Sequence, residues 1–212
     1  MNWREEANKI ASKLEGYRQD TTGWKEAKKS KDVTVYWKPS PDFEGALYKT
    51  EAMINASPET VFKYVDPMPD GKRVLWDKAI KDLNMVEQIE KDLFVLQTIT
   101  HSAVGGLISP RDFVDLIHTV DCDEFIATNA QFVEHNDCPV SSQFVRGKNY
   151  PSAIICEKVP GEANKTKVVN FIQTDLGGML PRSLVESALP SNQCDFFASL
   201  KKILIDDGMW QD

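Results

Sequence analysis

The apolar and polar positions of the chain predict a helix, then a long run of strands, then a second helix. Near the start, Trp3 to Tyr17 carries apolar residues at helical spacing, which predicts one amphipathic helix with a single buried stripe. After Gly23 the period changes to two, beginning with Val33 to Lys38, and Pro39 ends that run. The first part of the chain is therefore expected to pack a terminal helix against a sheet.

The middle of the chain predicts several short strands in succession. A strand over Ala46–Ile54 is followed by a short helix that Ser57 can cap, with Pro58 in its first position and its end before Asp66. Further strand-like stretches are Ala79–Gln88, Leu93–Thr100, Asp112–Val120, Phe125–Val133 and Lys167–Thr174, with a less regular one around Phe144–Val159. This succession indicates a meandering antiparallel sheet.

The last segment returns to helical spacing from Leu184 to Leu204, and Pro190 is expected to kink or locally unwind it. These elements predict an α+β fold in which a curved sheet wraps around the C-terminal helix. Residues 1–212 are expected to form one domain, since no linker, repeat or low-complexity tract interrupts them. Periodicity leaves open whether the concave face is filled or holds a cavity, and a filled core is the usual outcome.

Charge and composition exclude several classes of protein. The 25 Lys and Arg residues against 32 Asp and Glu residues give a net charge of −7, which is the wrong sign for binding nucleic acid. No apolar run approaches the roughly 18 residues of a membrane helix, and Met1 to Arg18 is amphipathic and charged, unlike a signal peptide. A cytoplasmic location is therefore expected.

The residues that usually carry chemistry are scattered. The four cysteines form no C-x-x-C pair, and His101, His118 and His135 lie on different predicted segments without a second ligand at metal-binding spacing. There is no G-x-S-x-G motif and no convincing nucleophile with its acid and base. We therefore expect no enzymatic activity, no metal and no cofactor.

Four sequence blocks, in order, carry a resemblance to a known family. They are Trp24-Lys25, Ile108–Asp115 (ISPRDFVD), Phe144–Gly147 (FVRG) and Gln173–Pro181 (QTDLGGMLP). Each is weak alone, but together they resemble the START family, the StAR-related lipid-transfer domains. Arg18–Trp24 and Val133–His135 are similar to the small soluble branch of that family associated with sterols, oxysterols and bile acids.

The resemblance implies a helix-grip fold, with a curved antiparallel sheet of about nine strands around a lipid cavity, the C-terminal helix as its lid and a helix at the N-terminus. It implies binding and transfer of one sterol-like lipid, such as cholesterol, an oxysterol or a bile acid, by a monomer that contacts a membrane surface transiently for loading and release. Two alternatives stay open, which are a carotenoid-binding START protein and a lipid sensor that does not transfer its ligand.

The candidate ligand-binding residues follow from matching the family motifs and from the strand period of two. They are Arg73, Leu96, Thr98, Thr100, Leu107, Phe113, Asp115, Ile117, Phe171, Gln173, Leu184, Ala188, Phe196 and Phe197. In some sterol-binding relatives a buried acid and base occupy the positions of Thr98 and Ile117. This chain lacks both charges, so its recognition of the ligand is expected to differ.

Several candidates also have an ordinary structural interpretation. Arg73 either meets a polar group of the ligand or pairs with a carboxylate at the surface. Thr98 and Thr100 either bind a ligand hydroxyl or are satisfied by neighbouring strands. Asp115 needs a partner, Arg111 or Arg73, unless it faces solvent.

Two further features concern the framework and the opening of the fold. Arg111 and Asp112 are expected to be structural clamps at a strand end. The loop His101–Ser109, which contains Gly105-Gly106, is expected to form a gate together with the helix around Pro190.

Overall fold

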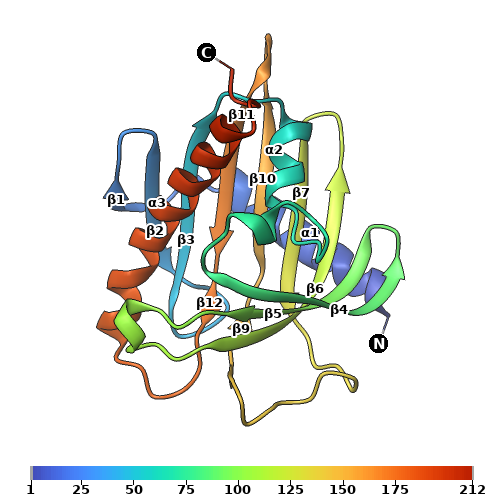
Figure 1. Ribbon diagram of the computed structural model, residues 1–212, viewed down its shortest axis with the longest axis vertical. Helices are drawn as coiled ribbons and strands as arrows, with labels where there is room; N and C mark the ends of the chain where they lie inside the picture. The colour runs from blue at the N-terminus through green and yellow to red at the C-terminus, as the bar shows by residue number, and fades with distance from the viewer. Residues whose placement is uncertain (1, 212) are drawn as a thin grey trace.

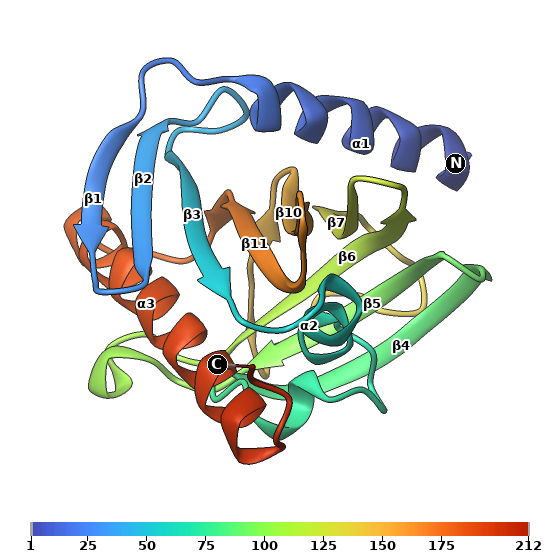
Figure 2. The same ribbon diagram turned by 90° about the horizontal axis from the view of Figure 1, so that it is seen from above.

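The computed structural model describes residues 2–211, in which a strongly curved antiparallel sheet is covered by helices on both faces (Figures 1 and 2). Its strands are β1 (Lys25–Lys29), β2 (Val33–Pro39), β3 (Ala46–Ile54), β4 (Ile80–Glu90), β5 (Leu93–Thr100), β6 (Arg111–Asp121), β7 (Phe125–Phe132), β8 (Val145–Arg146), β10 (Ser152–Val159) and β11 (Glu162–Ile172). The order is β1-β2-β3-β11-β10-β7-β6-β5-β4, and β8 pairs with β6 in parallel. Two short strands, β9 (Lys148–Asn149) and β12 (Thr174–Asp175), pair separately.

The helices lie on opposite faces of this sheet, as the view from above shows (Figure 2). Helix α1 (Trp3–Gln19) packs its buried stripe, which includes Ile10 and Leu14, against convex-face residues such as Leu116. Helices α2 (Pro58–Val65) and α3 (Arg182–Asp206) lie on the concave face. The predicted α+β helix-grip fold, with about nine strands around a C-terminal helix, is confirmed.

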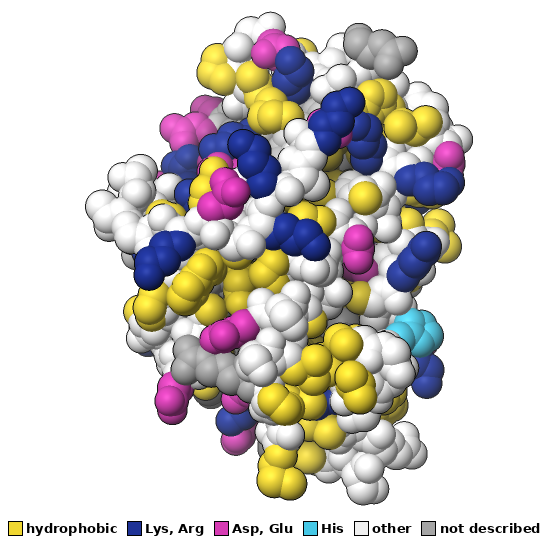
Figure 3. Space-filling view, turned by 90° about the vertical axis from the view of Figure 1, so that its left-hand side faces the viewer, with side chains coloured by type: hydrophobic (Ala, Val, Ile, Leu, Met, Phe, Trp, Pro, Cys, Tyr) yellow, Lys and Arg dark blue, Asp and Glu magenta, His cyan; other side chains and the backbone are white. Residues whose placement is uncertain are grey.

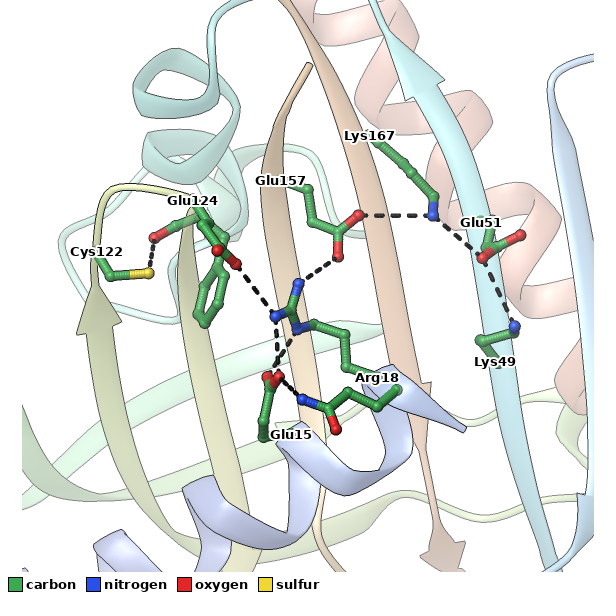
Figure 4. A network of polar contacts seen from close by, with 10 residues as sticks. Glu15, Arg18, Lys49, Glu51, Cys122, Glu124, Glu157 and Lys167 are labelled. Atoms are coloured by element: carbon green, nitrogen blue, oxygen red, sulfur yellow. Dashed lines mark hydrogen bonds and ion pairs between the residues drawn. The ribbon is translucent and has the colours of Figure 1, made fainter. Parts of the chain in front are cut away.

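A charged network ties α1 to the convex face (Figure 4). Arg18 pairs with Glu15 in its own helix at 2.7 Å and reaches Glu157 of β10 at 3.5 Å. Lys167 of β11 continues the network, because its Nζ lies 3.5 Å from Glu157 and 3.4 Å from Glu51 of β3. The network crosses three neighbouring strands and holds the C-terminal end of α1 over the middle of the sheet.

The start of α2 follows the predicted capping pattern. Ser57 is the N-cap, its Oγ accepts a hydrogen bond from the Thr60 backbone N–H at 3.3 Å, and Pro58 takes the first helical position. The helix ends at Val65, as expected from the residues that follow. This helix leads the chain from β3 to the segment of residues 67–77, which lies at one side of the concave face.

The two outer strands of the sheet differ from the inner ones, β1 in its exposure and β4 in its pairing. All five residues of β1 are exposed, and three of them are lysines. At the opposite margin, the pairing of β4 with β5 contains three register shifts. The sequence analysis missed β1, because Lys25–Lys29 has no alternation of apolar and polar residues from which a strand can be recognised.

A kink or local unwinding was expected at Pro190, and the helix is not unwound there, since α3 is continuous through this residue. Its C-terminal half fills the concave face, since Phe197, Leu200 and Leu204 are buried in one cluster with Val35 of β2 and Ile54 of β3. This part of the interior is therefore solid. The large cavity that the candidate residues line lies beneath the preceding turns of the helix, from Leu189 to Phe196.

Candidate functional site

A cavity of about 300 Å³ lies between the concave face and the N-terminal half of α3. One turn after another of the helix contributes to it, through Leu189, Asn192, Gln193 and Phe196, which share one helical face. The exposed residues Ala79 and Asn192 both line the cavity, so it reaches the surface there and is not sealed.

Many of the candidate residues line this cavity. They are Arg73, Leu96, Thr98, Thr100, Phe113, Asp115, Ile117, Phe171 and Phe196. The alternation predicted for β5 and β6 holds, because Val95, Val114 and Leu116 point to the opposite face and pack near α1. Phe171 is a special case: its ring packs 6.1 Å from Tyr17 and 6.3 Å from Trp24 on the α1 side. The ring of Phe171 therefore packs on the α1 side, although the residue is among those that line the cavity.

Gln173 was assigned to the wrong side of the sheet. It is buried on the α1 side, where its Nε2 donates to Pro151 O at 2.9 Å and to Asp42 Oδ2 at 3.1 Å. Because side chains alternate along a strand, the same shift of one position that misplaces Gln173 also misplaces the Phe171 ring. The residues of β11 that face the cavity are Asn170 and Ile172.

Four other candidates do not line the cavity. Leu107 is 69% exposed on the surface, because its loop projects away from the sheet. Phe197 packs into the solid cluster under the C-terminal half of α3. Leu184 and Ala188 are half-buried, and the helical face that covers the cavity starts one residue later, at Leu189. That face contains Asn192 and Gln193, so a search for an apolar stripe could not find it.

The sequence analysis also missed polar residues at the cavity wall. Thr128 of β7 and Asn170 of β11 line it, and Asn170 Nδ2 donates to Gln193 Oε1 of α3 at 2.8 Å. Asn149 of β9 lines it as well. The strand period of two would have indicated Thr128 and Asn170, but β9 is too short to be recognised by periodicity.

Arg73 lies in a short 3₁₀ turn, η1 (Arg73–Leu75), at the rim of the cavity. Its Nε pairs with Asp77 Oδ2 at 3.1 Å, and its Nη1 donates to Val65 O at 3.2 Å. The guanidinium also lies over the Phe196 ring, 5.4 Å from the centroid. Arg73 therefore has a carboxylate partner and links the turn to α3.

Asp115 is buried at the cavity wall, and its partner is neither of the arginines expected from the sequence. Asn149 Nδ2 donates to its Oδ2 at 2.7 Å. Arg111 instead donates to the carbonyls of Ser109 and Leu176, as a clamp between loops. Burial raises the pKa of Asp115 to about 7, and the hydrogen bond from Asn149 only partly opposes this. Close to neutral pH, the carboxyl group is therefore partly uncharged.

Of the two candidate threonines of β5, Thr100 has a structural partner. Its Oγ1 accepts a hydrogen bond from the Arg111 backbone N–H at 3.1 Å and lies 3.4 Å from Arg111 O. Thr98 lines the cavity two residues earlier. Thr100 thus helps hold the start of β6 in place. Threonine hydroxyls commonly form such hydrogen bonds between neighbouring strands.

The loop between β5 and β6 carries exposed apolar side chains beside α3. It contains a 3₁₀ turn, η2 (Val104–Gly106), in which Gly105 and Gly106 have φ values of 62° and 94°. Val104 and Leu107 are exposed, as is Met179 in the segment before α3. Figure 3, which looks onto the side of the molecule where α3 begins, shows apolar side chains gathered at its lower end.

Residues 5–206 match the family described as START domain, and the chain belongs to this family. StAR-related lipid transfer protein 5 of Bos taurus is 44% identical over 195 residues, covering 91% of each chain. The human StAR-related lipid transfer protein 6 is 36% identical over 202 residues, covering 95% of this chain and 91% of the relative. The solved structure of human StAR-related lipid transfer protein 5 superposes with a TM-score of 0.92 at 38% identity, covering 97% of this chain and 98% of that one.

Within the described residues, no helix has the length and apolar character needed to cross a membrane.

Proposed function

We propose that this chain binds one sterol-like lipid, such as cholesterol, an oxysterol or a bile acid, in the cavity under α3 and carries it between membranes in the cytoplasm. The observation that carries the proposal is the cavity itself, which occupies a place where a helix-on-sheet core is normally filled. The relatives named as lipid transfer proteins support it. No covalent chemistry is needed, and the ligand leaves as it entered.

The driving force is the removal of apolar surface from water. Ile117, Ile154 and Phe196 are among the apolar residues that line the cavity, and burying apolar area contributes roughly 25 cal/mol per Å². For a ligand of about thirty heavy atoms at about −0.3 kcal/mol per atom, binding is favourable by roughly 9 kcal/mol, which corresponds to a sub-micromolar Kd. That affinity permits both carriage and release.

The site must enlarge to take a four-ring ligand. The cavity of about 300 Å³ is at the lower limit of the 300–1,000 Å³ typical of ligand sites. A second hollow of about 240 Å³ lies next to it, and both are lined by Thr174 and Leu189. Because Leu189 directly precedes Pro190, whose nitrogen has no hydrogen to hold the helix, a small outward shift of this turn would join the two spaces.

The β5–β6 loop and this turn of α3 together form the proposed gate. The left-handed conformation of Gly105 and Gly106 costs glycine little, and exposed Leu107 and Met179 can contact a membrane surface during loading and release. Alanine at both glycines would restrict the loop, and we expect slower lipid exchange with unchanged capacity. Gly161 also has a positive φ, of 78°, in the β10–β11 turn, so Gly161→Ala is the matched control.

The test is transfer of a fluorescent sterol between two populations of vesicles. Ala130 lines the cavity, so Ala130→Phe fills part of the space that the ligand needs. Ala163 is exposed in β11, and Ala163→Phe adds the same ring outside the cavity. We expect wild type and Ala163→Phe to bind and transfer the probe, and Ala130→Phe to do neither.

Each other result has a definite meaning. Equal binding by Ala130→Phe and wild type would show that the lipid does not bind in this cavity. Binding without accelerated transfer would identify a sensor, a visible absorption band in protein from its own source would identify a carotenoid carrier, and chemical change of the bound lipid under mass spectrometry would identify an enzyme.

A further inference from the structure

Two buried polar atoms at the cavity wall have no hydrogen-bond partner within the described residues. They are Asp115 Oδ1 and Thr128 Oγ1, on residues that are 4% and 5% exposed. Three other buried atoms are also unsatisfied, but they belong to residues that do not line the cavity. Because an unpaired polar group is costly to bury, these two atoms are the positions at which a polar ligand group gains most.

The two atoms lie toward opposite ends of an apolar floor. Thr128 of β7 pairs with Thr119 of β6, which is four residues beyond Asp115 on the same strand. At about 3.4 Å per residue, the two positions are roughly 14 Å apart along the sheet. Between them, Ile117 and Ala130 pair with one another and line the cavity. A ligand lying along this floor has an apolar middle and a polar contact toward each end.

The chemistry at the Asp115 end favours an uncharged group. Asp115 Oδ2 already accepts from Asn149, which leaves Oδ1. The nearby Arg146 guanidinium is paired with Asp112 at 2.7 Å, so it is not available to a ligand anion. A hydroxyl can donate to Oδ1 when Asp115 is ionised and accept from it when Asp115 is protonated, whereas a carboxylate would be repelled by the ionised form. At the Thr128 end, the Oγ1 hydroxyl can donate or accept.

Resting on the proposed function, we propose that the preferred ligand is an elongated, uncharged sterol-like lipid with a hydroxyl toward each end, one paired with Asp115 Oδ1 and the other with Thr128 Oγ1. Asp115 and Thr128 are then specificity-determining residues for this site. The ligand class is narrower than the sterol-like lipids in general, since it excludes a carboxylate at the Asp115 end and favours a second hydroxyl.

The test compares the Kd of three probes. Cholesterol has a hydroxyl at one end, 25-hydroxycholesterol has one at each end, and lithocholic acid has a hydroxyl at one end and a carboxylate at the other. We expect wild type to bind the diol about three- to tenfold more tightly than cholesterol, which is the worth of one net hydrogen bond. Lithocholic acid should bind more weakly than the diol.

Substitutions assign this preference to the two residues. Thr128→Val and Asp115→Leu keep the branched heavy-atom skeleton of the side chain but remove its polar atoms, and each should weaken binding of the diol about three- to tenfold. The double variant should bind the diol and cholesterol equally. Ile117→Val lies between the two positions, removes one methylene and should weaken both sterols by the same factor.

The outcomes separate this inference from the proposed function. A wild type that binds both sterols without preference, or a double variant that keeps the preference, overturns the inference and leaves the lipid carrier intact. A wild type that binds none of the three probes overturns the proposed function itself.

Discussion

Asp112 and Asp115 are three residues apart on β6 and are both buried, yet their surroundings shift their pKa values in opposite directions. Burial would raise the pKa of Asp112, but hydrogen bonds from Arg146 and Gln97 outweigh burial and hold it below its ordinary value. Asp115 has the neutral Asn149 as its partner, so burial prevails there and its pKa rises. The first carboxylate is held in the framework by a cation, whereas the second has only a neutral partner and keeps one oxygen, Oδ1, without a hydrogen bond among the described residues.

The Asp112–Arg146 pair should be worth far more than a surface ion pair. Arg146→Met leaves a buried carboxylate without its cation, and we expect a loss of about 3–5 kcal/mol in the free energy of unfolding. Lys202 pairs with Asp206 on the exposed side of α3, and Lys202→Met should cost less than about 0.5 kcal/mol. Denaturant titration measures both. Equal losses in the two variants would contradict the buried pairing.

The raised pKa of Asp115 predicts a pH dependence with a definite sign. The stability associated with its neutral form is complete below about pH 4, the unfolded pKa, and is lost as pH rises through about 7. Asparagine stays neutral throughout. We therefore expect Asp115→Asn to match wild type near pH 4 and to exceed it near pH 8, by up to about 4 kcal/mol. Unfolding curves at several pH values check this, and a constant difference would contradict it.

At the scale of elements, the junction of α1 with the end of β11 depends on Gln173. Besides its bonds to Pro151 and Asp42, its Oε1 accepts from Ser40 Oγ at 2.6 Å, and its Nε2 lies 3.3 Å from the Tyr17 hydroxyl of α1. One amide therefore joins the helix, the β2–β3 connection and the strand end.

Gln173→Ala should destabilise the protein without affecting the lipid. We expect a loss of at least about 1–3 kcal/mol, because buried polar partners are left unsatisfied. The Kd for a sterol should stay unchanged, because this side chain faces α1 and not the cavity. Gln19 donates to Glu15 at an exposed position, so Gln19→Ala is a control that should cost little. A weaker sterol affinity in Gln173→Ala would contradict the placement.

Elements with one face toward the core could be predicted from the alternation of apolar and polar residues. Elements without a buried face could not. The limits of β3 and β5 match the prediction, since each has a long buried run. Strand β1 was missed because it is wholly exposed. The site was partly predictable for the same reason. Alternation along β5 and β6 predicted that Thr98 and Ile117 face the cavity, and both line it. On β11 the prediction was shifted by one residue, so the side chains chosen there point to the α1 side.

Helix α3 shows why the spacing of apolar residues could not predict the whole site. Its cavity face, from Leu189 to Phe196, mixes apolar and amide side chains, whereas its packed face, formed by Phe197, Leu200 and Leu204, is apolar. A helix that covers a solid core and one that covers a cavity can both display an apolar stripe. Only the three-dimensional packing shows which half of α3 covers the cavity and which half covers the solid core.

For the whole molecule, binding of a ligand under α3 should raise the thermal midpoint. A sterol at a free concentration of 100 times its Kd adds about 2.7 kcal/mol to the stability of the folded state. For a chain of this length, that corresponds to a rise in Tm of roughly 5–11 °C. Differential scanning calorimetry measures the rise. Ala130→Phe should show none, and an equal rise in that variant would indicate binding elsewhere.

The lysines of β1 and the irregular pairing of β4 also bear on how copies of this protein behave toward one another. An open sheet can in principle grow by adding a strand from a second chain, and long, flat, apolar margins invite such growth. Here one margin repels a like-charged neighbour and the other is twisted by its bulges. Fibril formation through either margin is thereby disfavoured, even when heating loosens α3 and exposes the apolar cavity beneath it.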